Sequence, residues 1–302
     1  MKSVYPINVS LNHAIRTAAA QRGDSKAFSR KSPLTRETVI RLLIGAEGGS
    51  LDKILHTAGI RVTASAVTQR RAQISPDVFR AVFDSFNSGC VDTALFRGYR
   101  LLAVDGTVVN LPRDPASASF VCHDGIPNGI NQLHLTPLYD ILSRTFTDAV
   151  IQPEPKKDEI GALITMLTRN DFDQNTLIIA DRGFEAYNLI AHQIEKPNVD
   201  FLIRVKQSRS AMREVAKLPM LELDRDISFS ICTTQKKADK ENKNNVFLQV
   251  PKNQSRGLPP GAGAGTSAII TPCVSAYAVF CWTTASLRLS QHHCRAPSRW
   301  RT

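Results

Sequence analysis

The stretch LLAVDGTVVNLP, residues 101 to 112, decides how the middle of this chain folds. Its first half is a short apolar run of the kind that forms a buried strand, and the run stops at Asp105, which a glycine follows. TLIIADRGF, residues 176 to 184, repeats the theme, because Asp181 ends a second apolar run. We therefore expect two buried strands that each carry an aspartate at the carboxyl end.

The segments around these strands predict a mixed α/β domain. Residues 131–142 and 144–153 alternate in polarity and predict an antiparallel hairpin. Helical spacing follows at 158–170 and again at 187–194, and DFLIRVK, residues 200–206, is typical of a last strand. We expect the strand before the first helix to lie beside the strand after it, through a right-handed crossover. The two aspartates would then meet at the edge where open α/β sheets bind ligands.

Two carboxylates held at one edge of a sheet repel each other unless a proton or a cation lies between them. Hard oxygen ligands favour Mg²⁺ or Mn²⁺. Such ions activate a water and stabilise the leaving oxygen when a phosphodiester is cleaved. A glycine near each acid leaves room for a sharp turn and for a close substrate. The alternative is that both sites are ordinary turns, in which Asp and Gly are frequent.

Charge divides the chain into three parts. Residues 1–98 carry 14 Lys and Arg against 7 Asp and Glu, whereas residues 99–241 carry 17 against 20. Residues 242–302 carry 7 basic residues and no acidic one. This division predicts a basic region that binds a polyanion, an α/β region that concentrates carboxylates, and a basic low-complexity tail. A solvated basic face is the alternative for the first region.

The basic first region is predicted to be helical. Apolar residues at helical spacing over 51–58 follow Ser50, a favourable N-cap, and a glycine turn leads into TASAVTQRRAQI, residues 63–74. Arg70 and Arg71 of the second helix are expected to point outward. Two helices joined in this way have the layout of a helix-turn-helix, whose second helix enters a DNA major groove. Two ordinary surface helices would show the same pattern.

The cysteines and the hydropathy argue against an exported or membrane protein. The six cysteines form no C-x-x-C pair, so a disulfide scaffold or a zinc ribbon has little support. The first ten residues lack an apolar signal segment, and we expect a cytoplasmic protein. Residues 257–287 are nearly uncharged, but prolines, serines and threonines dilute them, so no membrane insertion is expected.

Several blocks of the sequence, in the same order, resemble the DDE transposases of bacterial insertion sequences, in the insertion-sequence-four family. The blocks are AVDGTVVNLPRD, QLHLTPLYDILSRTFTDAVIQP, KKDEIGAL and IIADRGFEAYNLIAHQIEK followed by FLIRVK. The resemblance covers about residues 35–240. It implies a ribonuclease H-like mixed sheet with flanking helices, preceded by a helical DNA-binding region. It also implies that Asp105 and Asp181 are catalytic and bind Mg²⁺ (or Mn²⁺).

The resemblance implies DNA partners as well. In such enzymes an activated water cuts double-stranded DNA at the element end, and the freed 3′-hydroxyl attacks target DNA. Basic residues near the two aspartates are candidates to hold phosphates, and Arg204 and Lys206 share one face of the last strand. Solvated surface cations are the alternative. The flanking candidates are Lys156, Lys157 and Arg182.

The third acid implied by the family is missing. The family carries a glutamate within a Tyr-x₂-Arg-x₃-Glu-x₆-Lys pattern, and this sequence contains no such pattern. No acidic residue follows Glu241, an abrupt change that a shifted reading frame would produce, and a native low-complexity tail is the alternative. Two hypotheses result: an impaired transposase, or a truncated protein that binds DNA or a full-length partner without catalysis, as an inhibitor. A homodimer is the other possible assembly.

Two further residues bear on the site. An aspartate-nucleophile phosphatase would need an acid two residues before Asp105, and Ala103 stands there, so that class is excluded. His134 lies at a polar position of an alternating strand, between Leu133 and Leu135. We expect it to be an exposed strand residue.

Overall fold

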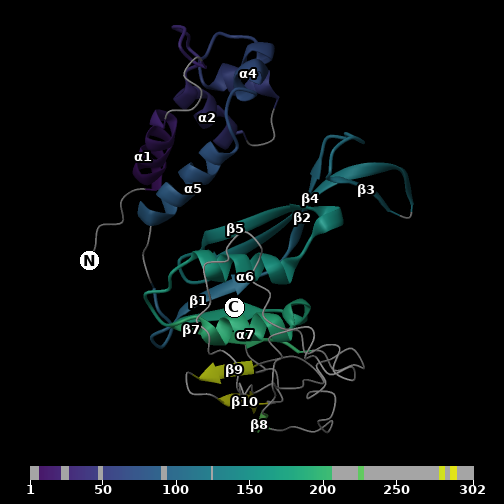
Figure 1. Cartoon of the computed structure of the whole chain (residues 1–302). Helices are drawn as coiled ribbons and strands as arrows, with labels where there is room; N and C mark the ends of the chain where they lie inside the picture. Colours follow the sequence, from purple (N-terminus) through teal and green to yellow (C-terminus); the bar gives the residue numbers. More distant parts are fainter. Residues whose placement is uncertain are drawn as a thin grey trace, which may run out of the picture. The chain divides into compact units, whose positions relative to one another are not determined.

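The computed structural model describes two compact units, residues Met1–Asp92 and residues Thr93–Thr302 (Figure 1). Each unit is considered by itself. The described residues are 7–21, 27–46, 50–89, 94–123 and 125–205, with the backbone of strands at 224–227, 279–282 and 286–290.

In its described residues the first unit consists of helices around one apolar core. Ala14 and Ile15 of α1 pack with Val39 and Ile40 of α2, and Val82 of α5 joins the same buried cluster. The helices are α1 (Ile7–Ala20), α2 (Arg36–Ile44), α3 (Leu51–Thr57), α4 (Ala64–Arg71) and α5 (Asp77–Gly89).

The predicted helix pair of this unit is confirmed as α3 and α4. The Ser50 side chain accepts a hydrogen bond from the backbone N–H of Lys53, and Thr63 caps α4 in the same way. Each cap satisfies an N–H group that the first helical turn leaves without a partner. Gly59, between the helices, has a φ of 67°, a backbone conformation that glycine adopts without strain.

The second unit is a mixed sheet with helices packed on it. The sheet order is β2-β4-β1-β6-β7, and β3 and β5 also pair with β4. A separate three-stranded sheet has the order β8-β10-β9. The strands are β1 (Arg100–Val104), β2 (Thr107–Leu111), β3 (Phe120–His123), β4 (Ile126–Asp140), β5 (Thr145–Pro153), β6 (Thr176–Ala180), β7 (Val199–Ile203), β8 (Asp224–Ile227), β9 (Val279–Trp282) and β10 (Ser286–Ser290). The helices are η1 (Glu154–Lys156), α6 (Glu159–Arg169), η2 (Arg182–Phe184) and α7 (Tyr187–Glu195).

The predicted hairpin, helices and last strand are confirmed, but one expected strand neighbour is wrong. The strand before the first helix, β5, pairs with β4 and not with β6. β6 instead pairs in parallel with β1. β5 pairs along one edge of β4, because a tight turn joins the two strands, and β1 pairs along the other edge. The far edge of β1 is therefore free, and β6 pairs there. This arrangement is the mixed α/β sheet with flanking helices that was expected.

The long strand β4 carries β1 and β2 one after the other along the same side. β1 pairs with Leu138–Asp140, and β2 pairs with residues 131–135. Asp105 and Gly106 lie in the interval between the two strands, opposite the middle of β4. The chain thus leaves the sheet for two residues at the point where the first aspartate stands.

Helices α6 and α7 lie side by side and cover the central strands (Figure 1). Leu163 and Met166 of α6 and Leu189 of α7 are buried with Leu102 of β1 and Ile178 of β6. This cluster removes the apolar side chains on the helix-covered face of the central strands from water, and such burial is the main favourable term in folding. It also fixes the carboxyl ends of β1 and β6 relative to the first turn of α6.

A buried ion pair ties β5 to the end of α6. Arg169 donates from Nε to Asp148 Oδ2 at 2.8 Å, and the Asn170 amide donates to the same oxygen at 2.6 Å. The Asp148 side chain is 1% exposed. Burial alone would raise the pKa of Asp148, but the hydrogen bonds from Arg169 and Asn170 outweigh it and hold the pKa below its ordinary value.

Three expectations fall on other parts of the chain. Lys206 and most of residues 242–302 lie outside the described residues. The nearly uncharged stretch 257–287 lies outside them too, except for strand backbone. Among the residues that the structure describes, no helix is long and apolar enough to cross a membrane.

We predict that Asp148→Ala lowers the free energy of unfolding of the second unit by about 3 kcal/mol, because it leaves the Arg169 charge without its partner. Asp171→Ala is the matched control, since its carboxylate is 97% exposed and 3.7 Å from Lys196. The control should change stability by less than about 0.5 kcal/mol. Urea unfolding followed by circular dichroism measures both. Equal effects of the two substitutions would contradict the structural role of the pair.

We also predict that the wild-type protein loses this contribution in acid. The folded pKa of Asp148 is depressed, so the stabilisation is complete above the unfolded value of about 3.9 and is lost as the pH falls through the folded pKa. Urea midpoints measured from pH 6 to pH 2 should fall more steeply for the wild type than for Asp148→Asn. Parallel curves would contradict the assignment.

Candidate active site at the carboxyl edge of the sheet

Asp105 and Asp181 each come directly after a residue of a paired strand, and these two residues lie opposite each other. Parallel pairing of β1 with β6 sets Val104 opposite Ala180, so the next residue on each strand is an aspartate. Both aspartates are exposed. Asp105 Oδ1 accepts a hydrogen bond from the N–H of Gly106 at 2.8 Å, and Asp181 Oδ1 accepts one from the N–H of Gly183 at 2.5 Å. The two carboxylates thus start from adjacent points of one sheet edge.

Glu159, in the first turn of α6, brings a third carboxylate to the same place. A Cβ atom built on Gly106 would overlap Glu159 Oε1. A Cβ atom built on Gly183 would lie 3.8 Å from Glu159 Oε2 and 3.2 Å from Asp181 Oδ1. The Glu159 carboxylate therefore lies close to the glycines that follow both aspartates.

His134 lies beneath this carboxylate, and the expectation that it is exposed is wrong. Its side chain is only 4% exposed. Nδ1 lies 3.0 Å from Glu154 Oε2, and Nε2 lies 2.8 Å from Glu159 Oε1 without the geometry of a hydrogen bond. The even-numbered positions of β4 from 134 to 140 face the core, so the polar face of the strand is the buried one.

Glu154 and Lys157 anchor the other side of the histidine. Lys157 Nζ donates to Glu154 Oε1 at 2.7 Å. This hydrogen bond, helped by His134, lowers the pKa of Glu154 below its ordinary value, and the same bond raises the pKa of Lys157. Glu154 is therefore a carboxylate at neutral pH, and it accepts a hydrogen bond from His134 Nδ1–H.

Gly106 must lack a side chain because Glu159 and His134 occupy the space that a Cβ atom would fill. The backbone conformation of Gly106 is not left-handed, but a Cβ atom there would lie 2.6 Å from His134 Nε2. The imidazole cannot yield as a flexible chain end would. The sequence-based explanation that this glycine makes room for a substrate is thus replaced by one in which it makes room for His134 and Glu159.

The predicted phosphate-holding cations differ in their surroundings. Lys156 and Arg182 are exposed, Arg182 directly after Asp181, and Lys157 is exposed but paired with Glu154. The backbone N–H of Arg204 donates to Ala180 O at 3.1 Å, which places Arg204 beside the end of β6.

The two arginines of α4 also differ. Arg71 is exposed. Arg70 is half-buried: its guanidinium lies 5.1 Å from the centre of the Phe28 ring, and it donates to Gln73 Oε1 at 3.1 Å. The expectation that both arginines point outward therefore needs correction for Arg70. Arg71 is the better candidate to meet a DNA phosphate.

The donor set at the sheet edge fits a hard divalent cation. Carboxylate oxygens are the ligands that Mg²⁺ and Mn²⁺ prefer, and Asp105, Asp181 and Glu159 supply them at one edge. Within the described residues, no three His, Cys, Asp or Glu side chains are already arranged around one point as metal ligands. Both aspartates turn an oxygen to their own backbone, so metal binding requires side-chain rotation.

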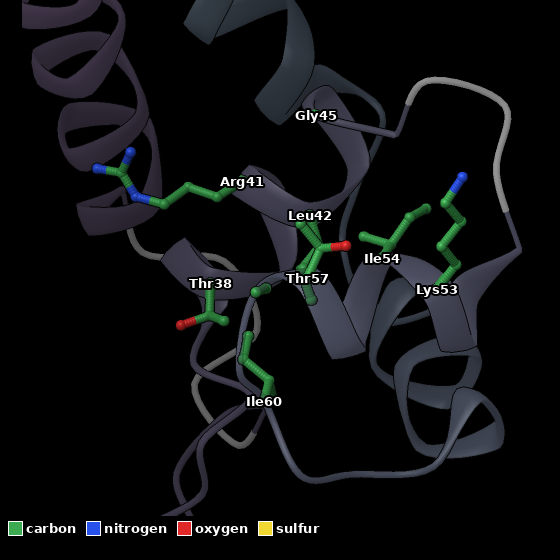
Figure 2. A pocket seen from close by; sticks show the side chains of 9 residues that line it. Thr38, Arg41, Leu42, Gly45, Lys53, Ile54, Thr57 and Ile60 are labelled. Atoms are coloured by element: carbon green, nitrogen blue, oxygen red, sulfur yellow. The ribbon is translucent and has the colours of Figure 1, made fainter.

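A cavity of about 520 Å³ lies in the first unit, lined by residues of α2, α3 and the turn after α3 (Figure 2). Leu42, Ile54 and Ile60 make it largely apolar. Figure 2 shows the guanidinium of Arg41 directed away from it, and Arg41 pairs with Glu37 at 2.8 Å. Among the described residues that line the cavity there is no acid and no imidazole.

The sequence-based interpretation missed Glu159 and His134 as members of the site. An acid in the first turn of a helix is expected from the helix dipole alone, so Glu159 gave no separate signal. His134 was assigned to the wrong face because its apolar neighbours were taken to face the core. The sequence does place both residues in blocks QLHLTPL and KKDEIGAL, which was the available signal.

Asp105, Glu159 and Asp181 lie within a stretch of the chain that matches a known protein family. A family model described as "Transposase DDE domain" matches residues 96–256, just over half of the chain. No curated protein matches the sequence. One similar solved structure is the piggyBac transposase synaptic complex with hairpin DNA, with 10% sequence identity and a TM-score of 0.37. That alignment covers 79% of this chain and 60% of the piggyBac chain. On the family match, the chain belongs to the transposase DDE domain family.

Proposed function

We propose that this chain is a metal-dependent DNA transposase that cuts and joins DNA at the ends of an insertion sequence of the insertion-sequence-four family. Asp105 and Asp181 are its catalytic carboxylates and hold Mg²⁺ (or Mn²⁺). The observation that carries the proposal is the parallel register of β1 and β6, which sets the two aspartates on adjacent strand ends within the matched domain. The double-stranded DNA of element ends and target is the substrate, in the cytoplasm.

Each part of the chain has a proposed task. Residues 1–98 bind DNA through α3 and α4, with Arg71 towards the phosphates and Arg70 holding α4 against Phe28. Residues 99–241 form the catalytic domain, which has the ribonuclease H-like type of mixed sheet. Residues 242–302 are a basic tail, out of frame or of low complexity. The exposed cations Lys156 and Arg182, with Lys157, Arg204 and Lys206, guide the DNA backbone past the acids.

The two proposed catalytic carboxylates start from defined positions at the sheet edge. A bound Mg²⁺ pair would supply an activated water and would stabilise the leaving oxygen. The chain itself orients the carboxylates: β1 and β6 fix the two aspartates, and the hydrogen bonds to the N–H groups of Gly106 and Gly183 define their starting positions. Nearby arginines and lysines hold the phosphates by charge, without reading base sequence.

The missing glutamate pattern favours reduced catalysis. A metal pair needs all of its ligands for position and charge, so we expect turnover orders of magnitude below that of an intact relative. The same observation supports a second candidate function. The chain would then be an inactive, truncated DNA-binding protein that inhibits a full-length transposase by pairing with it. The same contact between chains would allow two copies of this chain to form a homodimer.

We predict Mg²⁺-dependent nicking of element-end DNA by the 302-residue chain, slow but measurable. Asp105→Ala should lower the nicking rate by more than about 100-fold, because it removes a metal ligand needed in the transition state. Asp171→Ala, which removes an exposed carboxylate of the same unit, should nick at the wild-type rate. Radiolabelled duplex and denaturing gels give the rates.

The outcomes separate the two candidate functions. Binding of element-end DNA without nicking by the wild type would favour the inhibitor. Nicking that persists in Asp105→Ala would contradict the assignment of the catalytic carboxylate.

We further predict that Arg71→Ala weakens binding to element-end DNA by about 10-fold at moderate salt and lowers the salt slope by about one, because one phosphate contact is lost. Arg144→Asn is the control: it removes a positive charge at the β4–β5 turn, where the φ of 56° suits asparagine. It should leave affinity near the wild-type value. Fluorescence anisotropy at several salt concentrations measures both. Equal losses in the two variants would show a non-specific charge effect and reject α4 as the DNA contact.

A further inference from the structure

We propose that Glu159 is the third carboxylate ligand of the divalent cation at the site of Asp105 and Asp181. This inference rests on the proposed function. Glu159, on α6, is a different acid from the glutamate of the Tyr-x₂-Arg-x₃-Glu-x₆-Lys pattern, which this sequence lacks.

The position of Glu159 is the first argument. Its Oε1 approaches Gly106, the residue after Asp105, so closely that no side chain fits there. Its Oε2 and Asp181 Oδ1 lie 3.8 Å and 3.2 Å from one common point, the Cβ position of Gly183. One carboxylate thus reaches towards both aspartates. A side chain that served only the dipole of α6 would have no reason to take this position.

The imidazole of His134 also supports this role of Glu159. His134 Nδ1–H donates to the Glu154 carboxylate, and Nε2 is buried without a hydrogen-bond partner while it faces Glu159 Oε1 at 2.8 Å. A buried polar atom without a partner is costly, and it is rare unless a water or an ion completes its surroundings. An ion held by Glu159 would complete the surroundings of Nε2, and Glu154 and His134 are positioning residues for the Glu159 carboxylate.

The charge balance is the third argument. Lys157 is engaged with Glu154, and in the described part of the chain Glu159 has no ion-pair partner other than His134. Neither Asp105 nor Asp181 forms an ion pair within the described residues. Three carboxylates at one edge repel each other in the absence of a cation. A divalent ion with oxygen ligands removes this repulsion.

All three carboxylates border solvent. Both aspartates are exposed and short, and the Glu159 side chain is 32% exposed, so side-chain rotation towards a common ion meets water more than packed protein. The strand register and the first turn of α6 define the backbone positions from which the three side chains start.

Mn²⁺ binding to the full chain tests the inference without any need for turnover. Free Mn²⁺ is measured by electron paramagnetic resonance for the wild type, Asp105→Asn, Glu159→Gln, Glu159→Asp and the control Asp171→Asn. We expect both Glu159 variants to raise the Kd at least about 10-fold, as loss or displacement of one charged ligand does. The control should keep the wild-type Kd. Circular dichroism melting confirms that each variant is folded.

Glu159→Asp keeps an acid in the first turn of α6 but withdraws it by one methylene. A role restricted to the helix would leave Mn²⁺ binding unchanged in this variant, even if Glu159→Gln failed to fold. If Asp105→Asn loses Mn²⁺ while both Glu159 variants bind like the wild type, the inference is wrong and the proposed function stands. If Asp105→Asn also binds like the wild type, the inference and the proposed function both fail.

Discussion

Asp105 and Asp181 can share a site because β1 and β6 run parallel and pair residue for residue. The two acids are 76 positions apart in the chain, and no local turn can bring them together. The helices α6 and α7 hold the register, since their apolar faces are buried against the same strands. A shift of one residue would exchange the buried and exposed faces of a strand, so core packing and acid alignment are set by one constraint.

The sheet places polar groups under α6, where an apolar face would be expected. His134, Thr136 and Asp140 of β4 are buried on the face that the core uses, beside Leu138. Asp140 is paired with Arg100 at 2.7 Å, so its burial is compensated within the sheet. His134 and Thr136 differ from Asp140, because His134 Nε2 and Thr136 Oγ1 are buried without a hydrogen-bond partner among the described residues. A polar residue retained in a core at such a cost has more to do with the neighbouring site than with stability.

The sequence predicts the elements of this protein better than their neighbours. The strand that ends before Asp105, the hairpin, both long helices of the second unit and the cap Ser50 follow from local periodicity and N-cap chemistry. The pairing of β6 with β1 rather than with β5 depends on which edge is left free, and no local pattern encodes that. His134 was misplaced because two leucines beside it suggested the opposite face, and Glu159 because an acid at a helix start is commonplace.

β1 and β2, which are separated only by Asp105 and Gly106, both pair with the same strand, β4. Because β1 and β2 pair with successive parts of β4, the distance along the sheet between the end of β1 and the start of β2 is set by the residues of β4. A single-residue deletion inside β4 would leave the hydrogen-bonding edges largely matched and yet would turn the imidazole away from the acids. The number of residues along β4 therefore sets the spacing between β1 and β2, whereas the lengths of the surrounding loops do not enter it.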